Sequence, residues 1–282
     1  MAEIVLEHIT KRYPDGALAV DDFNLDTVSD DSNAQVTLGE QITEQQLLGG
    51  LLIHSADNYA DLLARWDAGS IAAFVAKMNT TAAALDMKQT HFADASGIST
   101  QSVSTASDIL KVAAPDMATP VLASIVDNNS VTLPVAGTLA TYTPLLGLQG
   151  VVGVKSGYTD AAGGCDVVAV IRPVHGRPTL LLAAVTGQTG AFALAQAGLH
   201  GLALVNAVQP LIGTSTTLQG GAVAAQVGAA GSSVAARTGA SVSMLTWPGA
   251  HAHGVRLRNQ NKRWSSERCG TSRVRRTGTT TR

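Results

Sequence analysis

Cysteine is scarce in this sequence. The two cysteines, Cys165 and Cys269, are too few for a disulfide framework. No C-x-x-C pair and no cluster of cysteine and histidine has the spacing of a zinc site, and neither His54 nor His91 has a ligand partner at such a spacing. We therefore expect no metal ion and no cofactor.

Long apolar runs are also absent. No stretch approaches 18 consecutive apolar residues, and the most apolar one, Ala191–Gly213, is interrupted by polar side chains. It predicts a buried or half-buried helix and not a transmembrane segment. Met1–Val20 carries charged residues throughout, so it lacks the apolar core of a signal peptide. The chain as written is therefore expected to stay in the cytoplasm.

Neither sign of charge dominates. The sequence has 19 Lys+Arg and 21 Asp+Glu, a balance that gives no bias toward nucleic acid or acidic membranes. The exception is Asn259–Arg282, which holds Lys262 and six arginines against the single acid Glu267. This tail is expected to be disordered. Because Trp264 is its only aromatic residue, nucleic-acid binding by the tail is the less favoured interpretation.

Strand patterns open the chain. Ile4–Leu6 and Leu18–Leu25 are both rich in strand-forming residues, and a turn composition lies between them at Pro14–Gly16. We expect the two strands to pair as a hairpin.

Helical patterns follow. Thr43, with Gln46 three residues later, forms a capping-box pattern ahead of a leucine-rich run. Ser70 predicts the N-cap of a second helix. The apolar residues of that helix repeat close to every 3.6 positions, at Ile71, Phe74, Val75, Met78, Ala82 and Leu85. A third helix is predicted over Thr105–Ala114, where Pro115 is expected to stop it.

The next region favours strands. Val151–Ser156, Cys165–Arg172 and Thr179–Val185 are β-rich, and the last two flank a tight-turn composition at His175–Pro178. Together they predict an antiparallel meander, which a helix over Ala191–Val208 follows.

One tripeptide carries chemistry. Lys155-Ser156-Gly157 closes a predicted strand, as the Lys-Ser/Thr-Gly triplet does in active-site serine transpeptidases, carboxypeptidases and class A β-lactamases. The ammonium attracts a substrate carboxylate and the hydroxyl donates to it, while glycine lets a ligand approach the strand closely. By itself the triplet also fits a turn with a solvated lysine.

Two further motifs place this triplet in a wider pattern. Leu51–Ala60 reads L-L-I-H-S-A-D-N-Y-A and Phe92–Gly97 reads F-A-D-A-S-G, upstream of G-V-K-S-G-Y-T-D-A-A-G-G-C at Gly153–Cys165. In order, spacing and flanks, the sequence from about residue 26 to about residue 258 resembles the low-molecular-weight D-alanyl-D-alanine carboxypeptidases, which are penicillin-binding serine peptidases.

The resemblance implies an α+β fold. A β-lactamase/transpeptidase-like antiparallel sheet is flanked by helices, is incomplete on its N-terminal side, and is followed by a small β module. The implied activity is hydrolysis of the D-Ala-D-Ala end of peptidoglycan stem peptides through an acyl-enzyme. The implied ligands are these peptides and β-lactams, and the implied location is the cell envelope.

Site residues follow from the same resemblance. Ser55 would relay protons as a general acid/base. Lys155 would bind the terminal carboxylate of the peptide with help from Ser156, beside Gly157, and the backbone N–H of Tyr158 would form half of an oxyanion hole. From the residues alone, Ser55 also fits a helix-end cap.

One position departs from the family pattern. Asp57 stands where the family's S-x-N motif has asparagine. An asparagine would donate its amide hydrogen to the substrate, whereas a carboxylate only accepts and adds negative charge near Lys155. We place Asp57 in the substrate site. The alternative is that Asn58 supplies the amide, which requires the backbone to shift by one residue.

The family's S-x-x-K motif is missing. Its serine is the nucleophile and its lysine removes the serine proton. The residues three positions before the six lysines are His8, Phe74, Leu85, Asp108, Val152 and Asn259. The chain is therefore expected not to acylate, and a non-catalytic binder of peptidoglycan or β-lactams is the alternative to an enzyme.

A second resemblance covers the start of the chain. Ile4–Leu25 resembles the first two strands of an ABC-transporter ATPase, with Tyr13 in the place of the aromatic residue that stacks on adenine. No G-x-x-x-x-G-K-[ST] motif occurs, so an ATP-binding transport component is the least favoured function. The two resemblances meet near Asp26, as in two unrelated sequences joined together.

The expected divisions are an ABC-ATPase-like hairpin (1–26), a partial transpeptidase-like domain (27–213), a small β module (214–258) and a basic disordered tail (259–282). The family has strands before the nucleophile that complete its sheet. Without them, Thr179–Val185 is expected to be an exposed sheet edge, unless the N-terminal strands at Ile4 and Leu18 cover it.

Overall fold

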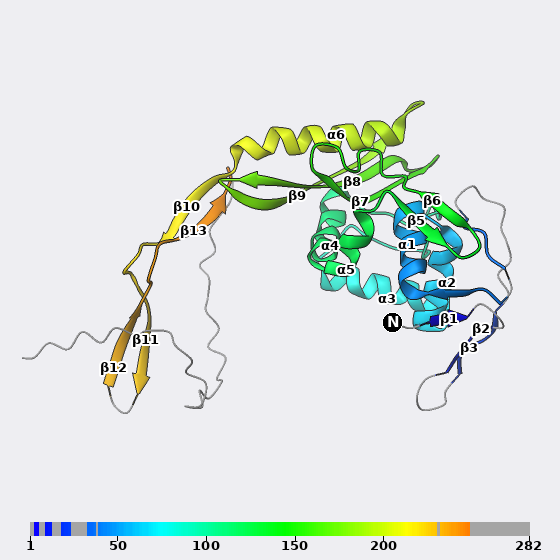
Figure 1. Cartoon of the computed structure of the whole chain (residues 1–282), viewed down its shortest axis with the longest axis horizontal. Helices are drawn as coiled ribbons and strands as arrows, with labels where there is room; N and C mark the ends of the chain where they lie inside the picture. The colour runs from blue at the N-terminus through cyan, green and yellow to red at the C-terminus, as the bar shows by residue number, and fades with distance from the viewer. Residues whose placement is uncertain are drawn as a thin grey trace, which may run out of the picture. The chain divides into compact units, whose positions relative to one another are not determined.

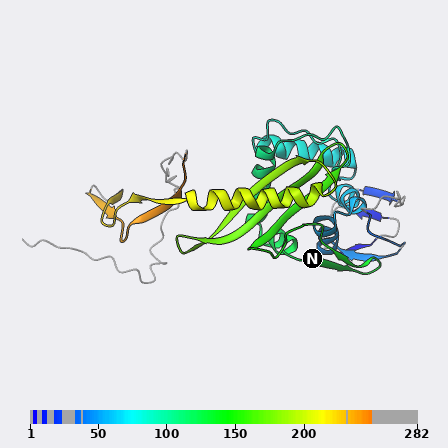
Figure 2. The same ribbon diagram turned by 90° about the horizontal axis from the view of Figure 1, so that it is seen from above.

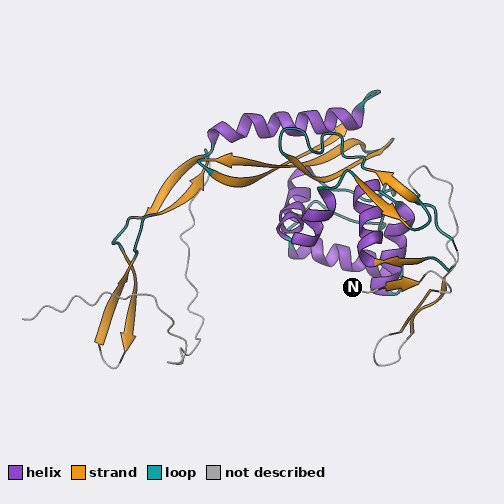
Figure 3. Ribbon diagram, in the orientation of Figure 1, coloured by secondary structure: helices purple, strands orange, loops and turns teal. Residues whose placement is uncertain are grey.

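The computed structural model describes residues 3–5, 9–12, 18–23, 33–37, 39–229 and 232–248. The predictions about Tyr13, the turn at Pro14–Gly16 and the basic tail lie outside these residues. The described part combines helices with antiparallel sheets (Figure 1, Figure 3). The predicted α+β class is therefore confirmed.

Among the described residues, the helices that precede the main sheet are α1 (Glu44–His54), α2 (Asp57–Ala68), α3 (Ile71–Ala84), α4 (Ala106–Ala118) and α5 (Pro120–Val126). The predicted capping box at the start of α1 is confirmed, because Gln46 N donates to Thr43 Oγ1 (3.2 Å) and Thr43 N donates to Gln46 Oε1 (2.9 Å). Ser70 caps α3 as predicted, where its hydroxyl accepts from Ala73 N at 3.1 Å.

The predicted stop at Pro115 is wrong. Helix α4 continues through Pro115 to Ala118, since an internal proline removes one hydrogen bond without forbidding a further turn. The chain leaves the helix at Thr119 (φ −91°, ψ 109°), directly before Pro120, because the residue before a proline avoids the α conformation.

Among the described residues no single helix is long and apolar enough to span a membrane. Only α4 and α5 together meet that length and composition, with a bend of 105° between them.

Close packing joins α1 to its neighbours. A Cβ atom on Gly50 would lie 2.5 Å from the ring of Tyr59 in α2, and one on Gly49 would lie 2.8 Å from Val131. Val131 belongs to a hairpin of β5 (Ser130–Leu133) and β6 (Gly137–Ala140) that the sequence analysis did not foresee. The buried members of this core are Ala34, Ile42, Leu47, Ala56, Tyr59, Leu62 and Leu133.

The predicted meander is confirmed as a three-stranded antiparallel sheet. Its strands β7 (Val151–Thr159), β8 (Gly163–Val174) and β9 (Arg177–Gln188) pair in the order β7-β8-β9. His175 and Gly176 link β8 to β9 with φ angles of 49° and 75°, the positive values that a tight two-residue hairpin turn requires.

Helix α6 (Ala193–Val208) lies along one face of this sheet, while α4 and α5 contact the sheet from the other side (Figure 1, Figure 2). Two glycines of α6 permit the close approach to β8. A Cβ on Gly201 would lie 2.7 Å from Val168, and one on Gly198 would lie 2.9 Å from Oδ2 of Asp166. Val151, Val168, Val170, Ala183, Leu202 and Val205 form the buried core between helix and sheet.

The N-terminal prediction is wrong in its pairing. Strand β1 (Glu3–Val5) pairs with β4 (Gln41–Thr43), and β3 (Leu18–Phe23) pairs with β2 (Ile9–Arg12). The unforeseen β2 lies nearer to β3 along the chain than β1 does, and neighbouring strands are the usual partners. None of the four joins the β7-β8-β9 sheet. Strand β9 is thus an outer strand, as predicted, and the suggestion that N-terminal strands cover it is wrong.

A short 3-10 turn (Gln209–Leu211) leads to four more strands: β10 (Gly213–Leu218), β11 (Val223–Ala229), β12 (Ser232–Arg237) and β13 (Val242–Thr246). They form two antiparallel ribbons, β10 with β13 and β11 with β12. These ribbons correspond to the β-rich pattern of the predicted C-terminal module, whose boundaries stay a prediction.

Candidate active site

Ser55 occupies the corner between α1 and α2. Its backbone is left-handed (φ 62°, ψ 34°), a conformation that is costly for a residue with a Cβ and that often marks functional positions. Its N–H donates to Leu51 O at 3.1 Å and so ends α1. Ser55 is therefore the C-cap residue of the helix by its backbone, while its hydroxyl is turned to another part of the chain.

That partner is Lys155 on strand β7. The Lys155 ammonium donates to Ser55 Oγ and to the backbone carbonyl oxygen of the next residue in β7, Ser156, each at 2.5 Å. The structure thus brings together two of the predicted site residues from a helix end and a sheet edge. Burial lowers the pKa of Lys155 to about 8, against the opposing effect of Asp166 and Asp57. The group is therefore cationic at neutral pH and close to its titration point.

Ser156 faces the opposite side of the sheet from Lys155, since successive residues of a strand alternate. Its side chain is 4% exposed, and its hydroxyl donates to Tyr142 O at 2.9 Å. The predicted donation to a ligand carboxylate is not what the hydroxyl does in this conformation. Its present role is to hold the segment at Tyr142 against β7.

Gly157 and Tyr158 complete the predicted strand residues. A Cβ placed on Gly157 would meet no atom within 4 Å, so the strand is open to an approaching ligand there. The Tyr158 side chain is 55% exposed, and its hydroxyl donates to Asp160 Oδ1 at 3.1 Å. Strand β7 is an outer strand, and one edge of such a strand presents backbone groups without a ladder partner.

Asp57 and Asn58 have different surroundings. Asp57 is the first residue of α2, and its charge helps to keep Lys155 protonated. The Asn58 side chain donates to Ala34 O (2.8 Å) and accepts from Ala34 N (3.1 Å). This amide anchors the segment at residues 33–34, so it is not directed to a ligand beside Lys155. The shift by one residue that the alternative requires would break both bonds.

The F-A-D-A-S-G motif folds around its carboxylate. Asp94 accepts from the backbone amides of Gly97 (2.7 Å), Ile98 (2.7 Å) and Ser99 (3.1 Å), and from Ser102 Oγ at 2.5 Å. Burial alone would raise the pKa of Asp94, but these hydrogen bonds lower it. The carboxylate of the motif thus gathers the residues that follow it, up to Ser102, and so orders the loop before α4.

Asp166 is a site residue that the sequence analysis missed. It lies on β8 directly opposite Ser156 and is 2% exposed. Neither carboxylate oxygen has a hydrogen-bond partner in the part of the chain that the structure describes. Burial raises its pKa to about 7, while the charge of Lys155 acts in the opposite direction. The feature of the sequence that could have pointed to Asp166 is a single acidic residue at the start of the apolar run Val167–Ile171.

The ring of His54, the residue before Ser55, is held in place by contacts with other parts of the protein. Its Nδ1 donates to Ala140 O at 2.9 Å, which requires a proton on that nitrogen, and its ring stacks on Tyr142 with centroids 4.7 Å apart. The described residues include no group of three acidic, histidine or cysteine side chains placed to bind a metal.

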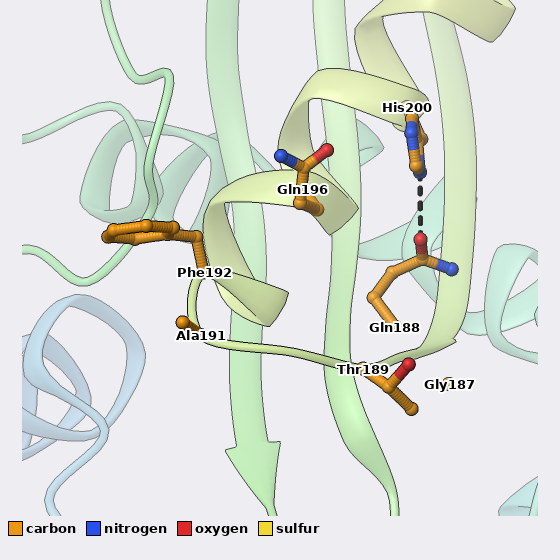
Figure 4. Close-up of a pocket in the computed structure, with 7 residues that line it drawn as sticks. All are labelled: Gly187, Gln188, Thr189, Ala191, Phe192, Gln196 and His200. Carbon is orange, nitrogen blue, oxygen red and sulfur yellow. Dashed lines mark hydrogen bonds between the residues drawn. The ribbon is translucent and has the colours of Figure 1, made fainter.

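Two hollows lie near the start of α6. One of about 570 Å³ is lined by residues including Gln188 and His200, whose side chains are hydrogen-bonded at 2.8 Å, with Phe192 pointing away from them (Figure 4). The other, of about 880 Å³, includes Tyr142, Tyr158 and Phe192. Only the second reaches strand β7, and it does so at Tyr158.

Comparison with known proteins agrees with this geometry. A sequence model described as D-alanyl-D-alanine carboxypeptidase matches residues 17–177, more than half of the chain. The chain belongs to the D-alanyl-D-alanine carboxypeptidase family. The predicted family is thus confirmed. The matched range overlaps residues 17–26 of the segment that resembles an ABC-transporter ATPase.

The matches with individual relatives in this family cover only part of each relative's length. D-alanyl-D-alanine carboxypeptidase DacB2 of Mycobacterium tuberculosis is 34% identical over 165 residues, which is 54% of this chain and 56% of the relative. D-alanyl-D-alanine carboxypeptidase of Streptomyces sp. strain K15 is 32% identical over 158 residues, 50% of this chain and 54% of the relative. The chain spans about half the length of the curated relatives it matches.

Solved structures of carboxypeptidases and penicillin-binding proteins share the fold. A D-alanyl-D-alanine carboxypeptidase from M. tuberculosis is 31% identical, with a TM-score of 0.55 over 64% of this chain and 70% of that one. Penicillin-binding protein D2 of Listeria monocytogenes, in its cefotaxime-bound form, is 25% identical, with a TM-score of 0.55 over 66% of this chain and 74% of that one. The predicted transpeptidase-like fold is confirmed.

Proposed function

We propose that this chain binds the carboxylate of a D-Ala-D-Ala stem peptide or of a β-lactam at Lys155, in the manner of the carboxypeptidase family, and that it does not form an acyl-enzyme. The observation that carries the proposal is the contact between Lys155 Nζ and Ser55 Oγ at 2.5 Å. It joins the two family motifs at the open edge of β7, next to Gly157.

The charge of Lys155 supports recognition of an anion. An ammonium in a partly desolvated position attracts a carboxylate more strongly than one in bulk water. Two of its three hydrogens serve Ser55 Oγ and Ser156 O, which leaves one for a ligand. Ser55 Oγ accepts from Lys155 and keeps its own hydrogen, which it can offer to the same ligand.

Catalysis needs a group that the printed residues do not supply. The family's acyl-enzyme forms on the serine of S-x-x-K, and no lysine in the sequence follows a serine at that spacing. We therefore propose binding of stem peptides or β-lactams in the cell envelope without turnover. A fluorescent penicillin is expected to give no covalent band and no increase in protein mass, and a stable adduct would show that another nucleophile acts.

Binding is tested by titrating a D-Ala-D-Ala peptide against the chain and its Lys155→Ala variant. We expect the variant to bind at least roughly tenfold more weakly, because a charged hydrogen bond is lost. Lys88→Ala is the matched control, since Lys88 is exposed and pairs with the exposed Asp86. Equal affinity of the chain and the Lys155 variant would remove the proposal.

A further inference from the structure

Helix α6 has an apolar side that faces away from the sheet. The helix lies on one face of the β7-β8-β9 sheet, and no described helix or strand covers its other side (Figure 1, Figure 2). Its 16 residues include no Asp, Glu, Lys or Arg. A helix side that meets water normally carries charged residues, so an exposed apolar side indicates an interaction surface. The exposed apolar residues of this side, which we name the α6 face, are Leu199, Ala203, Leu204, Ala207 and Val208, with Leu211 from the 3-10 turn that follows.

One row of the α6 face reads the same in both directions along the helix. Residues four positions apart lie one above the other on a helix, so Leu199, Ala203 and Ala207 follow each other along one side. Leu211 comes four positions later, in the 3-10 turn. The row is therefore Leu-Ala-Ala-Leu, with large side chains at its ends and small ones in its middle. Rows with this spacing are the ridges that interlock when two helices pack.

This order of side chains fits a second copy of the same chain. When an identical helix lies antiparallel across the row, a two-fold axis between Ala203 and Ala207 places Leu199 against Leu211 of the partner subunit, once on each side of the axis. The alanines meet at the centre, where their small side chains let the two backbones approach closely. One surface patch thus serves both copies.

The absence of charge from α6 also favours a second copy. Two identical uncharged faces meet without like-charge repulsion. A helix that lies on a membrane surface typically carries lysines and arginines beside its apolar face, and α6 has none. A second copy of the chain therefore fits the α6 face better than a lipid surface does.

The size of the α6 face is sufficient for a weak dimer. Its four larger side chains, Leu199, Leu204, Val208 and Leu211, are 47–56% exposed. Half of such a side chain presents on the order of 80 Å² of apolar surface, which gives roughly 400 Å² per copy when the two alanines are included. With the polar residues around it, a pair buries on the order of 1,000 Å², the lower limit for a specific interface. We therefore expect reversible association with a dissociation constant in the micromolar range.

We propose that the chain forms a two-fold symmetric dimer in which the α6 faces of two copies pack antiparallel. The dimer leaves the Lys155 site open. Gly198 of α6 lies next to Asp166 of β8, and Ser156, directly opposite Asp166, shares that face of the sheet. Lys155 therefore faces the other side. The proposal is independent of the proposed function.

The first experiment measures association of the full chain. Sedimentation equilibrium from about 1 to about 200 μM should show the average mass rising from that of a monomer toward twice that mass. Leu204→Glu should weaken association at least roughly tenfold, because an unpaired charge would be buried. Val121→Glu is the matched control, since Val121 on α5 is 50% exposed and Leu204 is 49% exposed. A chain that stays monomeric throughout, or equal association by Leu204→Glu, would overturn the proposal.

The second experiment tests the antiparallel arrangement with two variants, Leu199→Glu and Leu211→Lys. Each alone should associate at least roughly tenfold more weakly, since both ends of the contact would set a charge against a leucine. An equal mixture should recover to within about threefold of the unchanged chain. In the mixed dimer a carboxylate faces an ammonium at one end, and two leucines meet at the other. Recovery also shows that both variants fold, and a mixture that does not associate would contradict the two-fold contact.

A third variant tests the other surface through which copies could associate. Leu180→Lys lies on the outer strand β9, at a 37% exposed position. We expect it to leave the dissociation constant of the dimer unchanged. Loss of the dimer in Leu180→Lys would place the contact at β9 and would refute the assignment to α6.

Discussion

The Lys155 ammonium donates to Ser55 Oγ across a separation of 100 residues, and the same nitrogen donates to Ser156 O. One side chain thereby ties the left-handed corner after α1 to the outer strand of the sheet. The same nitrogen carries the charge of the site, so Lys155 belongs both to the candidate anion-binding site and to the packing between helix and sheet.

The affinity for an anionic ligand should fall as the pH rises through about 8. Burial lowers the pKa of Lys155 to about 8, so the lysine is cationic below that value and neutral above it. Calorimetric titrations of a D-Ala-D-Ala peptide between pH 6 and pH 10 should show the loss centred near pH 8, and not near the ordinary lysine value of about 10.4. Constant affinity up to pH 9.5 would mean that Lys155 does not bind the carboxylate.

Asp57→Asn should strengthen binding of the same peptide by roughly threefold or more at pH 7, since a negative charge next to the bound carboxylate is removed. The new amide also restores the donor that the family places there. Asp127→Asn, an exposed position at the end of α5, controls for the general effect of one charge. Weaker binding by Asp57→Asn would show that its charge serves the site mainly by keeping Lys155 protonated.

Asp166→Asn should stabilise the protein at alkaline pH. The folded-state pKa of Asp166 is raised to about 7, above its unfolded value of about 3.9. The stability it contributes is therefore complete below about pH 4 and is lost as the pH rises through 7. The variant avoids that loss, so its advantage should grow between pH 4 and pH 8 to on the order of 4 kcal/mol. Urea unfolding at pH 5 and pH 8 measures it, and parallel curves for both proteins would contradict the assignment.

Gly50→Ala should destabilise the helical core by about 1–3 kcal/mol, because its Cβ would lie 2.5 Å from the fully buried ring of Tyr59. Gly239→Ala is the control, since a Cβ there meets no atom within 4 Å. Thermal unfolding of both variants gives the comparison. A Gly50→Ala protein as stable as the control would show that α1 and α2 can move apart freely.

Local signals in the sequence predicted local structure well. The capping box at Thr43, the N-cap at Ser70 and the turn at His175 each depend on side chains within a few residues, and the structure confirms all three. The stop at Pro115 failed for the converse reason. The free-energy cost of a proline inside a helix is offset by the packing of that helix against other elements. The residues that pack against α4 lie far from Pro115 in the sequence, so a local pattern does not reveal them.

Pairing and burial needed information from distant parts of the chain. The partner of β1 is β4, which lies beyond two other strands along the sequence, and hydrophobic patterns alone do not choose between candidate partners. Asp166 is buried because Gly198 lets α6 approach β8 at that point. The motifs around Ser55 and Lys155 predicted that both residues belong to one site, but the inward orientation of Ser156 and the anchoring role of Asn58 depend on Tyr142 and Ala34, which no motif includes.

Strand β9 has a consequence for handling the protein in solution. It is 12 residues long, and from Thr179 to Gly187 it has neither a charged residue nor a proline. Charged residues and prolines are what natural sheets use to discourage association at an edge. Its free side should therefore act as a template on which copies of the chain stack into oligomers at high concentration. The working range of protein concentration will then depend on this backbone edge, and Leu180→Lys, at an exposed position of the strand, is the simplest way to widen it.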